Sequence, residues 1–225
     1  MGLQRVEVAL ARLKNPHAQL KVLQVAGTNG KGSTCALVGS CLSQRWRTGL
    51  YSSPHLVRVN ERFKVNGEDI GDEALGRCVA EIVEVLGVDH QLTYFELGTL
   101  VAFWHFARER VDLAVLETGL GGRLDATTAC APSVTAITPI DFDHMEYLGT
   151  TIEAIAGEKA GIIKPLVPVV SSAQQPDALR VLEVAAARAR APLWLEGRDF
   201  SGGAGEWWGR SWHFKDLELG LRGPH

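Results

Sequence analysis

The sequence has few cysteines and no long hydrophobic run. Its four cysteines show no Cys-x-x-Cys spacing, which favours free thiols in a reducing compartment over a disulfide framework. It has no stretch of about 18 apolar residues, the length that a membrane-spanning helix needs. The first residues, MGLQRVEVALARLKNP, carry charges through their apolar stretch and do not match a secretion signal. We therefore expect a cytoplasmic protein that does not bind membranes.

The chain also lacks an excess of positive charge and any internal repeat. Its formal net charge is -3 and its pI is about 6.2, so it has no global basic field that would attract nucleic acid. With 225 residues, 46% of them hydrophobic, it is long enough for one generous core but short for two full domains. We expect one principal domain and no nucleic-acid partner.

The apolar pattern alternates between strands and helices, which predicts an α/β fold with a mostly parallel sheet flanked by helices. Beyond residue 197, aromatic residues alternate with polar ones, which predicts a small antiparallel β appendage over residues 197–219. The predicted strands are Lys21–Ala26, Gly49–Tyr51, Asp112–Glu117, Ser133–Thr138, Val167–Val170 and Leu193–Leu195. The predicted helices are Val6–Leu13, Ser33–Ser43, Asp72–Leu86, Phe95–Arg110 and Pro176–Arg190.

A glycine-rich loop between a predicted strand and a predicted helix carries the strongest chemical signal. Its residues are Gly27, Thr28, Asn29, Gly30, Lys31, Gly32, Ser33 and Thr34. Glycines and a helix N-terminus present backbone amides to phosphate, Lys31 adds a positive charge, and Ser33 or Thr34 offers a hydroxyl to magnesium. The spacing departs from G-x-x-x-x-G-K-[ST], because Gly32 follows the lysine. A glycine turn with an incidental lysine is the alternative, and the flanking strand and helix favour a P-loop-type site for ATP and Mg²⁺.

Two further polar residues follow central strands. In open α/β sheets, ligands bind beyond the carboxyl ends of the strands, so Glu117 is placed to hold a metal ion and His144 should face the same cleft. The alternatives are a glutamate that is solvated or structural and a histidine satisfied within its own loop. Lys159 and Lys164 are by default solvated charges at helix ends. The segment Tyr51–Phe63, which contains Ser53, is by itself typical of an ordinary polar connection.

Five segments in order closely resemble one known family. They are GTNGKGS, SSPHLVRVNERF, TYFELGT, ETGLGGRLDATT and DHMEYLGTTIEAIAGEKAGIIKP, and they extend from residue 27 to residue 165. Together they resemble the folylpolyglutamate synthase and dihydrofolate synthase family, a branch of the Mur ligase superfamily. The resemblance implies an ATP-dependent ligase that adds L-glutamate to the carboxylate of a folate or of dihydropteroate through an acyl phosphate.

The resemblance also implies roles for individual residues. The loop residues Gly30–Ser33 would hold the phosphates of ATP, with Lys31 as a catalytic residue. Ser53 and Glu117 would bind one magnesium ion and His144 a second. Lys159 matches a lysine that this family carries as a carbamate. The residues implied to contact the pterin substrate are Thr93, Tyr94, Phe95, Glu96, Leu124, Asp125 and Ala126.

By this resemblance, residues 1–225 correspond to the family's ATP-binding domain. We expect the C-terminal domain that helps to bind the amino-acid substrate to be absent from the chain. Phosphoryl transfer needs positioning and charge neutralisation more than covalent catalysis, and Lys31, the amide loop and two metal ions would supply both. Two alternatives stay open: a truncated nucleotide-binding fragment without ligase activity of its own, and another Mur-type amino-acid ligase.

Overall fold

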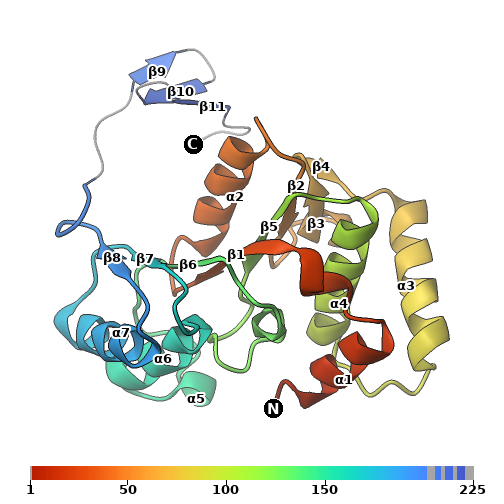
Figure 1. The fold of residues 1–225 in the computed structure, drawn as a ribbon, viewed down its shortest axis with the longest axis horizontal. Coiled ribbons are helices and arrows are strands. Elements are labelled where there is room, and N and C mark those ends of the chain that lie inside the picture. Colours follow the sequence, from red (N-terminus) through yellow and green to blue (C-terminus); the bar gives the residue numbers. More distant parts are fainter. Residues whose placement is uncertain (1, 202–205, 209–210, 215–216, 221–225) are drawn as a thin grey trace.

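An eight-stranded sheet forms the centre of the molecule (Figure 1). The computed structural model describes residues 2–201, 206–208, 211–214 and 217–220, with side chains described only up to residue 201. The strands of this sheet are β1 (Lys21–Ala26), β2 (Thr48–Tyr51), β3 (Phe63–Val65), β4 (Glu68–Asp69), β5 (Leu113–Glu117), β6 (Val134–Ile137), β7 (Val169–Ser171) and β8 (Leu193–Leu195).

The strand order is β4-β3-β2-β5-β1-β6-β7-β8. The six strands from β2 to β8 in this order run parallel, whereas β3 and β4 pair antiparallel at one edge. Because parallel strands end at the same edge of a sheet, the residues that follow β1, β5 and β6 lie near one another. The predicted mostly parallel α/β sheet is confirmed. The edge pair was not predicted, since β4 has only two residues and shows no period.

Helices cover both faces of this sheet (Figure 1). They are α1 (Gln4–Arg12), α2 (Lys31–Leu42), α3 (Asp72–Leu86), α4 (Tyr94–Arg108), α5 (Met145–Leu148), α6 (Ile152–Lys159) and α7 (Pro176–Ala189). Four 3-10 helices lie between them: η1 (Pro16–Gln19), η2 (Val59–Arg62), η3 (Ala126–Ala129) and η4 (Ala160–Ile162). Among the described residues, none of the helices has both the length and the apolar character needed to cross a membrane.

The side chains of β1 and β5 alternate between two cores. Val25 and Val115 pack with Cys35 of α2 on one face. On the opposite face, Leu116 packs with the α1, α3 and α4 helices in the largest core cluster. The other half of that face, over β6 and β7, is covered by α6 and α7, where Ile155 and Leu182 are fully buried. This face therefore carries two groups of helices. One group is α1, α3 and α4, the other is α6 and α7, and the central strands end between them.

Most predicted elements agree with the structure. β1, α3 and β8 begin and end at the predicted residues, and α4 begins at Tyr94, one residue before the prediction, because Thr93 caps it. α5 and α6 were not predicted, since α5 is only four residues long and α6 ends in a buried lysine. The predicted appendage is a three-stranded antiparallel sheet of β9 (Glu206–Trp208), β10 (Ser211–Phe214) and β11 (Leu217–Gly220). Its first turn, at residues 209–210, lies outside the described residues.

α4 packs closely against the sheet at Gly49 of β2. A Cβ atom at this position would lie 2.8 Å from the ring of Phe106, which is fully buried. Contacts that short do not occur in proteins, so one of the two groups would have to move. The strand therefore needs a glycine here to let α4 lie against the sheet.

We predict that Gly49→Ala destabilises the protein by about 1–3 kcal/mol, the usual result of overpacking a core. Gly76→Ala is the control, because a Cβ atom in that position of α3 meets nothing within 4 Å. That substitution should instead stabilise the helix by up to about 1 kcal/mol. Urea denaturation measures the free energy of unfolding of both variants. Combining Gly49→Ala with Phe106→Leu should restore part of the stability that Gly49→Ala loses. Equal stability of Gly49→Ala and the wild type would contradict this account of the packing.

Candidate functional site

The glycine loop after β1 is held against the residues that follow β6. Gly27 has φ of 146°, and a Cβ atom there would lie 1.9 Å from the hydroxyl oxygen of Thr138, so only glycine fits. The amides of Thr28 and Asn29 donate to the carbonyl of Pro139 at 2.9 and 3.3 Å. The Thr28 hydroxyl donates to the carbonyl of Asp141 at 2.9 Å. The first part of the loop thus uses its amides within the protein.

The second part of the loop begins α2 and has the properties of an anion site. Gly30 precedes the helix with φ of 82°, and no side chain caps the first turn. The first amides of a helix have no partner within it, and the helix dipole favours negative charge at this end. Lys31 lies in this turn, and its Nζ donates to the carbonyl of Thr28 at 3.0 Å. The amides available to phosphate are therefore those at the start of α2 rather than those of Thr28 and Asn29.

Glu117, the last residue of β5, lies beside this turn. Its side chain is buried, with its carboxylate oxygens 3.6 Å from the place of a Cβ atom on Gly32. It accepts the amide of Ser53 at 3.1 Å. Burial raises the pKa of Glu117, and the Ser53 amide and the Lys31 charge only partly oppose this. A buried carboxylate next to a phosphate loop would regain its full charge when a cation binds to it.

Lys159, at the end of α6, is buried at the same place. Only 3% of its surface is exposed, and its Nζ donates to the carbonyl of Gly27 at 2.7 Å. Burial, together with the charge of Lys31, lowers the pKa of Lys159 to about 8, and Asp143 opposes the shift. Lys164, in contrast, is partly exposed. Lys159 is therefore no solvated helix-end charge.

His144 follows β6 and borders the same site. It has a left-handed backbone with φ of 46° and directly precedes α5. Its Nε2 lies 3.6 Å from a carboxylate oxygen of Asp143, and about half of its side chain is exposed. The ring is thus accessible from the cleft described below, and it is placed beyond a central strand as the sequence predicts.

The oxygen donors at this site suit magnesium better than a transition metal. No group of three or more His, Cys, Asp or Glu side chains within the described ranges could hold a metal ion by itself. Mg²⁺ is commonly bound by one or two carboxylates together with substrate phosphates and water. Glu117 and the nearby Ser53 match that pattern, because they offer a carboxylate and a hydroxyl beside the phosphate-binding turn. A metal here would need a nucleotide to complete its coordination.

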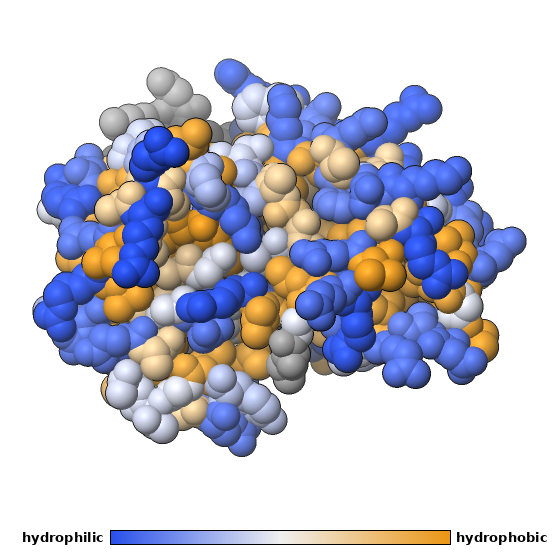
Figure 2. All heavy atoms as spheres, turned by 60° about the horizontal axis from the view of Figure 1, so that its bottom comes forward, coloured by the Kyte–Doolittle hydropathy of each residue, from blue (hydrophilic) through white to orange (hydrophobic). Residues whose placement is uncertain are grey.

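A cleft of about 870 Å³ connects this turn to the residues implied for substrate binding. Lys31, Ser53 and His144 line one part of it. All residues that the resemblance assigns to the pterin, except Tyr94, line it too: Thr93, Phe95, Glu96, Leu124, Asp125 and Ala126. Figure 2 brings forward the side that carries α1 and α5, where apolar side chains are exposed among charged ones. One ligand in this cleft can thus reach both parts of the site.

Tyr94 lies differently from its neighbours. Its side chain is largely exposed, and the guanidinium of Arg62 lies 5.3 Å from the centre of its ring. The Nε of Arg62 also donates to Nδ1 of His55 at 2.9 Å. Because Arg62 lines the cleft, Tyr94 contributes to the site by supporting that arginine.

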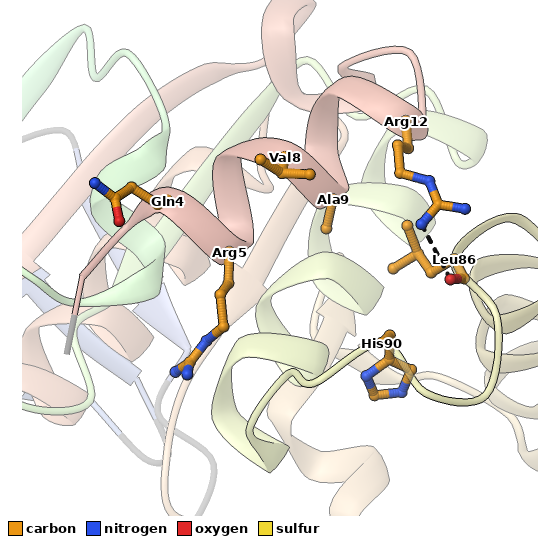
Figure 3. A pocket seen from close by; sticks show the side chains of 7 residues that line it. All are labelled: Gln4, Arg5, Val8, Ala9, Arg12, Leu86 and His90. Carbon is orange, nitrogen blue, oxygen red and sulfur yellow. Dashed lines mark hydrogen bonds between the residues drawn. The ribbon is translucent and has the colours of Figure 1, made fainter.

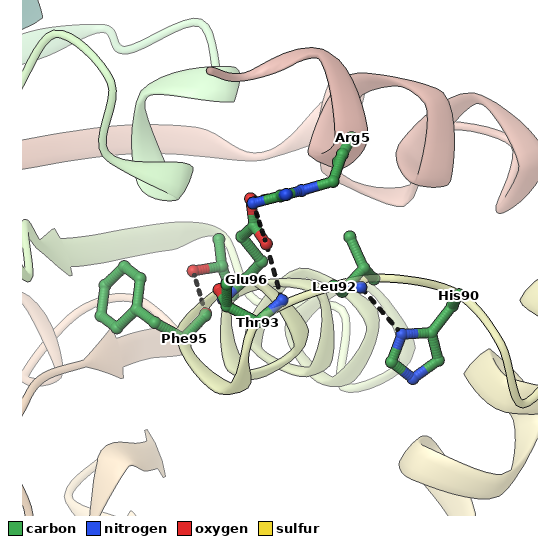
Figure 4. A network of polar contacts seen from close by, with 7 residues as sticks. Arg5, His90, Leu92, Thr93, Phe95 and Glu96 are labelled. Carbon is green, nitrogen blue, oxygen red and sulfur yellow. Dashed lines mark hydrogen bonds and ion pairs between the residues drawn. The ribbon is translucent and has the colours of Figure 1, made fainter. Parts of the chain in front are cut away.

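Glu96 and Thr93 use their polar atoms to begin α4 (Figure 4). Thr93 and Glu96 each accept the other's amide, at 3.2 and 2.7 Å, in a capping box. Arg5 reaches from α1 to the same carboxylate, with its Nη2 at 3.0 Å. Burial alone would raise the pKa of Glu96, but the Thr93 amide and Arg5 outweigh it and lower the pKa. The carboxylate of Glu96, which lines the cleft, is therefore already bound by Arg5 and by the Thr93 amide.

Asp125 acts as a clamp on the loop that follows Glu117. One carboxylate oxygen accepts the amides of Gly119 and Leu120 at 2.8 and 3.0 Å. The other accepts the amide and the hydroxyl of Thr127 at 3.0 and 2.5 Å. With four donors on its carboxylate, Asp125 shapes the floor of the cleft through the backbone that it holds.

A second, smaller groove of about 250 Å³ lies between α1 and the end of α3 (Figure 3). Val8, Ala9 and Leu86 form its apolar part. Arg12 closes one side, because its Nη1 donates to the carbonyl of Leu86 at 3.1 Å. No residue of the phosphate loop lines this groove.

Comparison with known proteins agrees with this geometry. Residues 25–189 match the model of the Mur ligase middle domain. The chain belongs to the Mur ligase family. This Mur ligase is 46% identical over 199 residues to the dihydrofolate synthase/folylpolyglutamate synthase of Bacillus subtilis, covering 85% of this chain and 46% of that protein. It is 45% identical over 171 residues to the enzyme of the same name from Escherichia coli, covering 76% of this chain and 40% of that protein. The chain thus spans about half the length of these relatives or less.

Solved structures of folylpolyglutamate synthases share the fold of this Mur ligase domain. A complex named FPGS-AMPPCP superposes with a TM-score of 0.88 at 36% identity, over 96% of this chain and 56% of that one. A structure named E. coli FolC in complex with DHPP and ADP superposes with a TM-score of 0.85 at 38% identity, over 100% of this chain and 54% of that one. The names of these structures include a nucleotide or an analogue of one.

Several residues of the Mur ligase site could not be found from the sequence. Arg5 lines the cleft, and so do Arg62 and Glu158, which lie within two of the five matched segments but were given no role there. Glu158 lies 3.5 Å from Arg123. Arg5 and its partner Glu96 are 91 residues apart, so no local pattern reveals the pair. A buried amide, Gln24, was also missed because it occupies an ordinary position within a strand. Only the residues within short motifs gave a local signal.

We predict that the stability of the protein rises with pH through Lys159. Its pKa is about 8 in the folded chain against 10.5 for a free lysine, so between these values the unfolded chain binds more protons. The free energy of unfolding should therefore increase between pH 8 and pH 10.5 in the wild type. This increase should exceed that of Lys159→Met by on the order of 1–3 kcal/mol. Denaturant titrations at several pH values measure this, with Lys164→Met as the control that keeps the effect. Parallel pH profiles of the wild type and Lys159→Met would contradict the burial of this amine.

Proposed function

We propose that this Mur ligase domain binds ATP with Mg²⁺ and catalyses phosphoryl transfer for the addition of L-glutamate to a folate or a dihydropteroate. The observation that carries the proposal is the continuous cleft, which Lys31 and Ser53 line together with Phe95 and Leu124. Its apolar and aromatic walls suit a flat ring system, and its other part suits a triphosphate. The relatives' names support the same substrates, since they print folylpolyglutamate and dihydrofolate synthases.

The reaction follows from the chemistry of a carboxylate, which is a poor electrophile. An oxygen of the acceptor carboxylate attacks the γ-phosphorus of ATP, the bond to the β-γ bridging oxygen breaks, and ADP leaves. The resulting acyl phosphate is attacked at its carbonyl carbon by the glutamate amine, which loses a proton as inorganic phosphate departs. The transferred group carries charge on its oxygens throughout, so positioned positive charge and amide donors lower the barrier.

The residues of this chain would serve that reaction in distinct ways. The amides at the start of α2 and the Nζ of Lys31 would bind the phosphates after Lys31 turns away from the carbonyl of Thr28. Glu117, Ser53 and, for a second ion, His144 would hold magnesium, which when bound neutralises phosphate charge. Phe95 and Leu124 would place the acceptor ring so that its carboxylate points to the phosphate-binding turn.

We also propose that Lys159 reacts with carbon dioxide to form a carbamate. A neutral amine is needed for this reaction, because an ammonium group has no free electron pair. The lowered pKa and the burial of Lys159 supply such an amine beside the phosphate loop. The Nζ attacks the carbon of CO₂, loses a proton and becomes an anionic group, which a bound cation would stabilise.

A nucleotide-binding unit without ligase activity of its own is the second candidate. It needs only the turn at the start of α2, where Lys31 lies beside Glu117. The two candidates share the nucleotide site and differ only in amide formation. Assays of glutamate incorporation with pteroate and with tetrahydrofolate separate them, once nucleotide binding has been measured.

We predict that Lys31→Ala weakens binding of AMPPCP with Mg²⁺ by about tenfold or more, since it removes the charge nearest the phosphates. Thermal stability should change little, because Lys31 is partly exposed. Lys21→Ala is the matched control, as Lys21 is exposed at the start of β1, the strand that leads into the glycine loop. Calorimetric titration gives the affinities and a melting curve confirms folding. Equal affinity of folded Lys31→Ala and Lys21→Ala would rule out the phosphate role.

For the carbamate, we predict that Lys159→Ala loses nearly all ligase or ATP-hydrolysing activity and regains part of it with added formate or acetate. Lys159→Arg should stay inactive, because a guanidinium keeps the positive charge and cannot form a carbamate. Isotope-labelled bicarbonate provides a readout besides activity: NMR should show a carbamate carbon in the wild type and none in Lys159→Ala. Full activity of Lys159→Arg would refute the modification. The same NMR spectrum from the wild type and Lys159→Ala would refute it too.

A further inference from the structure

A buried amide at the centre of β1 connects the segments that form the two parts of the site. The Nε2 of Gln24 donates to the hydroxyl of Thr127 at 3.0 Å and to that of Thr128 at 2.8 Å. Gln24 and Thr127 have no exposed surface, and Thr128 has only 3%. Both threonines belong to η3, which lies more than 100 positions along the chain from β1. Gln24 therefore ties the strand that leads into the phosphate loop to the segment that follows Glu117.

The hydrogens of this network fix the orientation of the amide. The Thr127 hydroxyl donates to Asp125 at 2.5 Å, and the Thr128 hydroxyl donates to the carbonyl of Gly122 at 2.7 Å. A hydroxyl has one hydrogen, so both threonine oxygens can only accept from Gln24. The NH₂ group of Gln24 must face them, and both of its hydrogens are then used. A carboxylate or an apolar side chain at residue 24 could not serve these two acceptors.

The network has two branches that reach different parts of the site. Through Thr127 it reaches Asp125, which holds the amides of Gly119 and Leu120 on the floor of the cleft. Through Thr128 it reaches the carbonyl of Gly122. The next residue, Arg123, donates its amide to the carbonyl of Glu158 at 2.8 Å, directly before Lys159. One branch thus fixes the acceptor side, and the other fixes the helix that carries the buried lysine.

The protein keeps this arrangement although it leaves a polar atom unpaired. The Oε1 of Gln24 is buried and has no hydrogen-bond partner among the described residues. An unpaired buried carbonyl oxygen costs free energy that an aliphatic side chain of similar size would not. A position selected only for packing would therefore favour leucine or methionine. Gln24 thus joins β1 to η3 through its NH₂ group, while its oxygen has no partner among the described residues.

We propose that Gln24 is a positioning residue that holds the 118–128 segment in register with the phosphate loop, and thereby shapes the acceptor part of the cleft. The proposal rests on the proposed function for its ligands, but its structural part can be tested without them. Gln24 itself lines no part of the cleft, so it acts through Thr127 and Thr128. We expect Gln24 to affect binding of the acceptor, the folate or dihydropteroate. The phosphates would contact the amides at the start of α2, which make no hydrogen bond to Gln24.

The test compares Gln24→Met with Thr135→Val. Methionine keeps the size of glutamine and removes both donors. Thr135 is a buried threonine of β6 whose hydroxyl donates to the carbonyl of Pro168 at 3.3 Å, outside this network. Amide hydrogen exchange measured by NMR should show Gly119 and Leu120 exchanging about tenfold or more faster in Gln24→Met only. The amide of Thr118, which donates to the carbonyl of Val25, should keep its rate in both variants.

Binding of two probes then tests the effect on the site. In Gln24→Met, affinity for pteroate should fall by about tenfold or more, while affinity for AMPPCP with Mg²⁺ should stay within about twofold. Thr135→Val should leave both affinities near the wild-type values. If Gln24→Met does not fold, Thr127→Val and Thr127→Ser form a matched pair, of which only the valine variant should weaken pteroate binding and speed the exchange of the Gly119 and Leu120 amides.

The outcomes separate this proposal from the proposed function. Wild-type exchange rates at Gly119 and Leu120 in Gln24→Met would overturn the positioning role whatever the ligands do. An equal loss of both affinities, or no loss of pteroate affinity, would also overturn it, because the residue would then serve stability alone. A wild-type protein that binds neither probe would instead refute the proposed function, and the exchange rates would still decide the role of Gln24.

Discussion

The contact between Gly27 and Thr138 is the constraint on which the rest of the site depends. Because residue 27 has no side chain, the ends of β1 and β6 approach so closely that a Cβ atom would lie 1.9 Å from the threonine hydroxyl. The carbonyl of Gly27 is then directed to the Nζ of Lys159, and the chain turns into α2 beside Glu117. A side chain at residue 27 would move the phosphate loop away from both groups.

The site combines carboxylates that accept several hydrogen bonds with two buried groups that each make a single hydrogen bond within the protein. Asp125 and Glu96 accept hydrogen bonds from their own surroundings, so they stabilise the walls of the cleft. Glu117 and Lys159, in contrast, are buried beside the phosphate loop with pKa values shifted towards their neutral forms. Lys31 and Asp143 oppose these shifts only in part, so a bound cation or a covalent modification would change the charge of both groups further. Internal hydrogen bonds thus hold the walls of the cleft, whereas the charges beside the glycine loop are only partly balanced within the protein.

The two faces of the sheet have different parts in this arrangement. The α2 face is a small apolar core around Cys35 and supports only the helix that begins at the phosphate loop. The opposite face carries the large helical groups, and between them lies the buried polar network around Gln24. Polar atoms in a protein interior are costly unless they are paired, and the pairing here joins β1 to η3. The polar network around Gln24 and the residues beside α2, among them Glu117, therefore lie on opposite faces of the sheet.

The sequence by itself determined the alternation of strands and helices, the glycine loop at Gly27–Thr34 and the placement of Glu117 and His144 beyond central strands. Those features follow from periodicity and from residues next to one another in the chain. The resemblance to the family also led to the expectation that Lys159 is less exposed than Lys164, and the structure agrees. Only the tertiary structure decided that Tyr94 lies under Arg62 outside the cleft and that Arg5 pairs with Glu96. Each of these depends on contacts between segments far apart in sequence, and burial, which shifts a pKa or turns a side chain, exists only once those segments have packed.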